Sequence, residues 1–178
     1  GRSALVPAQS ARIRLFVGDF HMVGCESLDK RRAPETLVDA KFAMPFLVAA
    51  AILRGGLSVA NFSPDGLRDP DVRALAGKIE PVADPDLDWT MEMPPGRVEI
   101  TLDDGRSFTA TGTRVPGNAD APLGWDGVIA KFRECCAAAH TPPDPATVTR
   151  VAEMAQDLDG MSDATEILRV LTRAPACA

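Results

Sequence analysis

The chain has 178 residues, with 25 acidic against 19 basic side chains, and its formal net charge is −6 at pH 7. This length suits one domain with a hydrophobic core, or a small domain with an appendage. The acidic balance argues against nucleic-acid binding, and no apolar run approaches the roughly 18 to 20 residues that span a membrane. A start at Gly1-Arg2-Ser3, without a signal sequence, predicts a cytoplasmic protein and a piece of something longer.

The residue pattern in the first third of the chain predicts a strand, a connection and a helix. Apolar and basic residues alternate over residues 11–17, as in a half-buried strand. Residues 18–33 carry many charges and few apolar pairs, which indicates a long connection. Thr36 and Asp39 have the spacing of a capping box, and the pair Gly55-Gly56 ends the helix that follows.

That central helix has an apolar stripe with a 3.6-residue period, which predicts a buried face. Its members are Phe42, Phe46, Ala49, Ala50 and Leu53. Pro45 interrupts the pattern because proline has no backbone N–H and disfavours the helical conformation of the residue before it. The helix therefore either bends at Pro45 or restarts there.

The middle of the chain predicts short helices and then a hairpin. Ser63-Pro64 and Asp69-Pro70 each place a capping residue before a proline, so two short helices are expected. A short strand over residues 78–82 and a loop over 84–96 follow. Alternating residues 97–102, a turn at 103–106 and a second apolar alternation at 108–110 indicate a β-hairpin.

Three helices are expected at the C-terminal end. The first has an apolar stripe from Trp125 to Ala139, the second begins at Asp144-Pro145 and ends at Gly160, and Ser162 caps the third. Strands gathered around helices without a repeated strand–helix–strand unit indicate the α+β class. The expected architecture is a small, mainly antiparallel sheet with helices packed on one face, followed by C-terminal helices.

Few side chains suggest a self-contained reactive centre. The four cysteines (Cys25, Cys135, Cys136 and Cys177) form no disulfide framework, and the histidines (His21 and His140) have no metal-ligand spacing, so no metal and no cofactor are expected. No hydrolase, phosphate-loop or dinucleotide motif occurs. The basic cluster Lys30–Arg32 with Lys41 is either a solvated charged loop or a local field that attracts a carboxylate.

Four segments, in the same order, resemble the C-terminal part of the MmgE/PrpD family, which includes 2-methylcitrate dehydratases and cis-aconitate decarboxylases. They are residues 39–51 (DAKFAMPFLVAAA), similar to the family's (D/E)AKFS(L/M)PYAVAVAL; 69–79 (DPDVRALAGKI); 95–106 (PGRVEITLDDGR); and 122–132 (PLGWDGVIAKF). The chain departs from the family at Phe46, where many members have tyrosine, so a hydrogen bond from that hydroxyl to substrate is absent.

The resemblance implies a lid domain over residues 1–131 and helices over 132–178 that return to a missing all-helical domain. It implies a metal-free lyase that dehydrates or decarboxylates a small di- or tricarboxylate, with Lys41, Phe46 and Arg32 nearest the substrate. The family's acid/base groups lie outside this chain, so the catalytic residues are unknown and the chain alone is expected to be inactive. The expected partners are the substrate, the missing helical domain or subunit, and a second copy in a homo-oligomer. The alternative is a non-catalytic α+β dimerisation or regulatory module.

Overall fold

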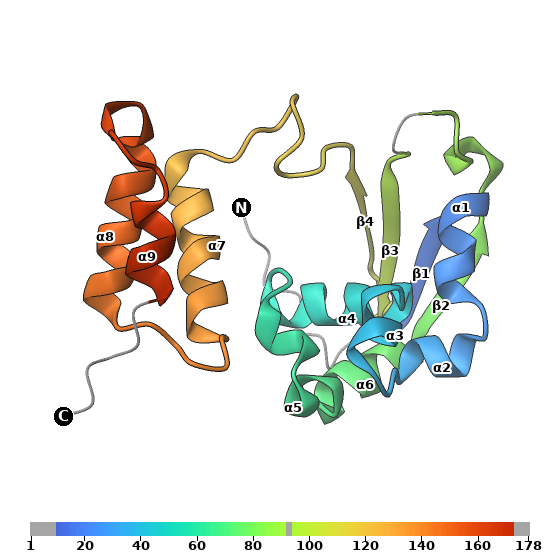
Figure 1. Ribbon diagram of the computed structural model, residues 1–178. Coiled ribbons are helices and arrows are strands. Elements are labelled where there is room, and N and C mark those ends of the chain that lie inside the picture. Colours follow the sequence, from blue (N-terminus) through green and yellow to red (C-terminus); the bar gives the residue numbers. More distant parts are fainter. Residues whose placement is uncertain (1–9, 92–93, 173–178) are drawn as a thin grey trace. The chain divides into compact units, whose positions relative to one another are not determined.

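A computed structural model describes residues 10–91 and 94–172 of the chain (Figure 1). The chain divides into two compact units, residues 1–121 and residues 122–178. The division lies at Ala121–Pro122, whereas a boundary after residue 131 would fall inside the unbroken helix α7 (Trp125–Ala137). Among the described residues, no helix is both long enough and apolar enough to cross a membrane.

The first unit is built on a four-stranded sheet. Its strands are β1 (Ser10–Val17), β2 (Ile79–Ala83), β3 (Gly96–Leu102) and β4 (Ser107–Gly112), in the spatial order β2-β1-β3-β4. β1 and β2 are parallel, and the other two pairs are antiparallel. The sheet is therefore mainly antiparallel, and the α+β class is confirmed. The predicted strand at 11–17, the short strand at 78–82 and the hairpin are all present.

The helices that link β1 to β2 cover one face of this sheet (Figure 1). They are α1 (Asp19–Met22), α2 (Leu28–Arg32), α3 (Leu37–Lys41), α4 (Met44–Arg54), α5 (Pro64–Leu67) and α6 (Pro70–Gly77), with 3-10 turns at Val23–Cys25 and Val59–Phe62. Ile13, Leu15 and Ile79 from the strands pack with Phe46, Ala49 and Val72 from the helices. On the opposite face, ion pairs join Arg12 to Glu80 and Arg14 to Glu99.

The expectation of a long connection over residues 18–33 was wrong, because this stretch holds α1, a 3-10 turn and α2. Each is too short to show a hydrophobic period. Their stability comes from tertiary contacts instead: Cys25 is 4% exposed in the core, and α2 packs against α4 and α6.

The central helix restarts at the proline, as one of the two predicted alternatives. Thr36 caps α3, its hydroxyl oxygen accepting a hydrogen bond from Asp39 N, and α4 begins at Met44 with Pro45 in its first turn. Gly55 ends α4 with φ 76°, the left-handed conformation that favours glycine. The break changes the phase of the apolar stripe. Phe46, Ala49 and Ala50 are fully buried, but Phe42, expected on the same face, follows the end of α3 and is 63% exposed.

The second unit consists of α7, α8 (Pro145–Gln156), a 3-10 turn at Leu158–Gly160 and α9 (Glu166–Thr172). Asp144 caps α8 through Ala146 N and Thr147 N, as expected. Ser162 was predicted to cap the last helix, but α9 starts later, at Glu166. Asp163 Oδ1 accepts a hydrogen bond from Thr165 N just before it. Within α7, all of which is described, no side chain is buried.

Candidate functional site

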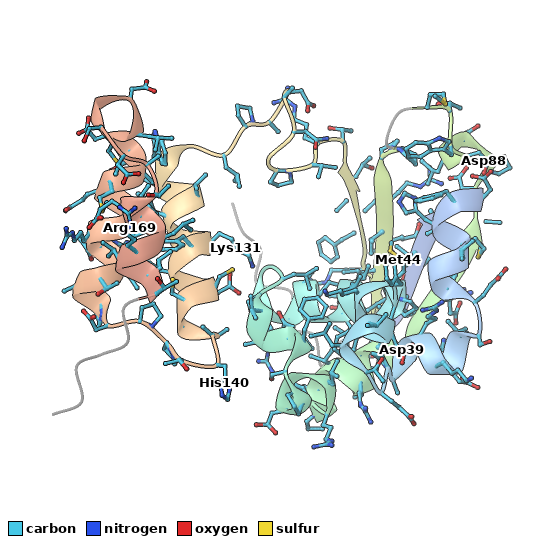
Figure 2. All side chains as sticks on the ribbon, in the orientation of Figure 1. Asp39, Met44, Asp88, Lys131, His140 and Arg169 are labelled. Carbon is cyan, nitrogen blue, oxygen red and sulfur yellow. The ribbon has the colours of Figure 1, made fainter. Side chains whose placement is uncertain are left out.

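Two adjoining hollows in the first unit share His21 and Met44 in their walls. The first, called here the strand-end cavity, has about 530 Å³ and is lined by the end of β1, the start of β3 and the segment after β4. The second, called the helical groove, has about 580 Å³ and is lined by α1, the following 3-10 turn, Arg31 of α2, α3 and the start of α4. Met44 and Asp39, at this site, are labelled in Figure 2.

The break between α3 and α4 shapes the helical groove. Because α3 ends at Lys41, Lys41 and Phe42 are exposed beside the groove while Met44 is half-buried at its edge. The opposite wall approaches closely at Gly24. A Cβ atom at Gly24 would lie 2.7 Å from Met44 Cγ and 3.1 Å from the Phe42 carbonyl oxygen, so a larger residue there would push the walls apart.

A reciprocal pair of hydrogen bonds holds α1 against the 3-10 turn Pro85–Leu87 and the residues after it. Asp88 Oδ1 accepts from Asp19 N at 2.8 Å, and Asp19 Oδ1 accepts from Trp89 N at 3.0 Å. The bond from Trp89 N, and then one from Phe20 N, hold the pKa of Asp19 below its ordinary value. As a result the Phe20 ring lies 5.3 Å from the Trp89 ring and 5.4 Å, edge to face, from His21.

Gly18, which precedes α1, makes this approach possible. A Cβ atom at Gly18 would lie 1.9 Å from the Leu87 carbonyl oxygen, a distance that real Cβ atoms essentially never show. Gly18 also lines the strand-end cavity with Leu87, so the same close approach positions one wall of the site.

The helical groove gathers cationic side chains that are not in ion pairs. Lys41 makes no hydrogen bond or ion pair within the described part of the chain, and Arg31 uses Nε to donate to the Glu26 carbonyl oxygen at 2.8 Å. Asp39 is the acidic side chain in the groove wall, and its carboxylate accepts a hydrogen bond from the Thr36 hydroxyl at 2.7 Å. Elsewhere arginines are neutralised directly, as Arg97 is by Asp84 and Arg54 by Asp69. The groove can therefore attract an anion although the chain is acidic overall.

The structure places the three sequence-predicted site residues differently. Lys41 lines the helical groove. Arg32 instead joins α2 to β2, donating from Nη2 to the Ile79 carbonyl oxygen at 2.7 Å, while its buried Nε has no partner in the described part of the chain. Phe46 is 0% exposed in the hydrophobic core. Within the first unit, neither Arg32 nor Phe46 joins Lys41 in the groove wall.

Arg31 and His21 line the helical groove, although the sequence did not single them out as site residues. Three consecutive basic residues point in directions about 100° apart once they form a helix, so only one of them can face a given groove. Without knowledge of α2, the sequence could not tell Arg31 from Arg32. His21 had no motif around it, and its place between the two hollows follows from α1, which no periodic pattern signalled.

Other reactive groups are not assembled for chemistry in the described residues. No group of three or more His, Cys, Asp and Glu side chains there could hold a metal ion. Burial raises the pKa of the Cys25 thiol to about 11, so it remains protonated and unreactive at neutral pH. Cys135 and Cys136 lie on α7 in the second unit, and Cys177 lies outside the described residues.

Comparison with known proteins yields a family match and two weak relatives. The model of the MmgE/PrpD C-terminal domain matches residues 4–158. The mouse (Mus musculus) cis-aconitate decarboxylase is 26% identical over 167 residues, which cover 93% of this chain and 33% of that protein. The human (Homo sapiens) cis-aconitate decarboxylase is 25% identical over 153 residues, covering 83% and 32% respectively. The chain thus spans about a third of the length of these relatives.

Proposed function

The chain belongs to the MmgE/PrpD family, and we propose that it is the carboxylate-binding C-terminal portion of a lyase acting on a small di- or tricarboxylate. The observation that carries this proposal is the helical groove, in which Lys41 and Arg31 form no ion pair with any described residue, in a chain of net charge −6. The two relatives named as cis-aconitate decarboxylases support the same class of substrate.

In the proposed mechanism, this chain binds and the remainder of the protein supplies the acid and base. Lys41 and Arg31 hold a carboxylate and stabilise the enolate-like charge that develops when a proton leaves the adjacent carbon. The positive charge comes from side chains, so the proposal includes no metal and no cofactor. In a dehydration, the electron pair left by that proton forms the new C=C bond as the neighbouring hydroxyl, protonated by the acid, leaves as water. In a decarboxylation no proton leaves first: loss of carbon dioxide leaves the electron pair on the substrate, the same cations stabilise the charge, and the acid then protonates the carbon.

The two units take different roles in this proposal. The larger unit acts as a lid that excludes water from the substrate, and α7, α8 and α9 return to an all-helical domain outside these residues. Exposed apolar side chains on the second unit support that second role, since Trp125, Leu158 and Leu168 lie on its surface.

An activity assay tests the proposal. The 178-residue chain is incubated with 2-methylcitrate or cis-aconitate, alone and together with the polypeptide encoded immediately upstream of residue 1. We expect turnover with the upstream polypeptide and none by the chain alone. Activity of the chain alone, or inactivity of the combined protein toward both acids and their close relatives, would contradict the proposal.

The second candidate function is a non-catalytic dimerisation or regulatory module. The apolar stripe on α7, in which Trp125 and Val128 are exposed and no side chain is buried, favours it. Sedimentation separates the two candidates: a homodimer of the chain that does not bind the upstream polypeptide favours the module, and a complex that contains both polypeptides favours the lyase.

A further inference from the structure

The walls of the helical groove are mostly apolar and unusually exposed. Phe20, Val23, Val38 and Phe42 line it with exposed fractions of 58%, 61%, 63% and 63%, and half-buried Met44 completes the wall. Small-molecule sites commonly have such walls, with a few polar groups that orient the ligand. Four exposed apolar side chains add nothing to the affinity for a fully polar acid, because a polar ligand gives them no apolar surface to be buried against.

The charged groups of the groove lie beside these apolar walls. Lys41 and Arg31 contribute two positive charges and Asp39 one negative charge, and the Asp39 carboxylate is already hydrogen-bonded to Thr36. Neither cation is in an ion pair within the described part of the chain. The groove therefore combines side chains that attract an anion with an apolar surface that gains by burial, and these two features suit different parts of one ligand.

We propose that the helical groove binds a carboxylate that carries an apolar substituent, with the carboxylate on Lys41 and Arg31 and the substituent against Val38, Phe42 and Met44. The inference rests on the proposed function for its carboxylate class and adds the apolar substituent, which the groove walls select. Each methylene that leaves water for the groove should tighten binding about fourfold. Loss of a charge-assisted contact at Lys41 should weaken binding about tenfold, whatever the substituent.

Titration of the whole 178-residue chain tests this. Succinate, methylsuccinate and butylsuccinate are added to the isotope-labelled chain at constant ionic strength, and dissociation constants are read from amide chemical shifts. We expect affinity to rise along the series, with shifts centred on residues 20–24 and 38–44. Phe42→Ser should reduce the dependence of affinity on the length of the ligand's alkyl group, whereas Lys41→Gln should weaken the binding of all three ligands by a similar factor.

Matched controls keep the result interpretable. Lys30→Gln removes a neighbouring charge that lines another hollow, and Leu168→Ser removes an equally exposed apolar side chain, 63%, from the second unit. Both variants should leave the affinities for the three succinates unchanged. Val38→Ser serves as a second wall variant if Phe42→Ser disturbs the spectrum as a whole.

Three results would overturn the inference. One is a dissociation constant for succinate within twofold of that for butylsuccinate. Another is a gain in affinity from succinate to butylsuccinate that is the same in the parent, Phe42→Ser and Val38→Ser. The third is an occupied groove: a dimer, or a complex with the upstream polypeptide, that protects residues 20–24 and 38–44 and abolishes butylsuccinate binding. Failure of the lyase assay with the binding series intact would instead contradict the proposed function alone.

Discussion

Phe46 and Phe42 lie on either side of the break between α3 and α4, and replacing each by tyrosine should have opposite consequences. Phe46 is 0% exposed and packs in the core with strand and helix residues, whereas Phe42 is 63% exposed. A hydroxyl added at Phe46 enters this apolar surrounding without a partner and should lower the free energy of unfolding by about 1 to 3 kcal/mol. The same hydroxyl at Phe42 meets solvent and should change that free energy by less than about 0.5 kcal/mol.

The assay is urea unfolding monitored by the fluorescence of Trp89, which lies in the first unit. Trp125 belongs to the second unit, so both variants are made in a Trp125→Phe background to remove its signal. Phe46→Ala provides the scale of a core deletion, about 3 to 5 kcal/mol. Equal stability of Phe46→Tyr and the parent would contradict a fully apolar surrounding for Phe46, because it would show that the added hydroxyl finds water or a partner. In that case Phe46 could face a substrate cleft, as the family resemblance implies.

Three further predictions follow from local geometry. Gly18→Ala should destabilise the first unit by about 1 to 3 kcal/mol in urea unfolding, because its Cβ would collide with the Leu87 carbonyl oxygen; an unchanged midpoint would contradict the close approach. Asp69→Ala should cost about 0.5 to 2 kcal/mol through loss of the α6 cap. The hydrogen bond from Arg54 lowers the folded-state pKa of Asp69, so the extra stability of the wild type over Asp69→Ala should be complete above pH 3.8, the ordinary pKa, and should shrink as the pH falls below it. A stability difference that persists in acid would contradict this direction. In a Cys177→Ser background, iodoacetamide at pH 8 should modify the two neighbouring cysteines of α7 and spare Cys25 until unfolding; rapid labelling of Cys25 would show that its thiol is not buried.

The sequence carried the local signals of this fold well. Alternation in β1 and in the β3–β4 hairpin depends only on the two-residue period of a strand, so it is visible without knowledge of any partner. The caps at Thr36, Ser63 and Asp69 are likewise local, because each side chain bonds a backbone N–H two or three residues ahead.

Features that depend on tertiary contact were harder to predict. α1 and α2 span four and five residues, too few for a hydrophobic period, and their place against the core is what stabilises them. The exposure of Phe42 follows from the α3–α4 break, which shifts the helical phase by an amount that the sequence does not reveal. The same holds for the candidate site: the sequence pointed to Lys41 and Arg32, whereas the structure places Lys41 and Arg31 in the groove wall, since Arg32 donates a hydrogen bond to β2.

Steady-state kinetics of the complete protein with Lys41→Ala show whether the helical groove binds the substrate carboxylate. The control is Lys30→Ala, which removes an equal charge one residue from Arg31 but outside the groove. The proposed role predicts that Lys41→Ala raises KM about tenfold for every carboxylate substrate and also lowers kcat, because Lys41 binds the carboxylate and stabilises the charge that develops on it, while Lys30→Ala behaves like the parent. Equal KM values for the two variants and the parent would contradict it.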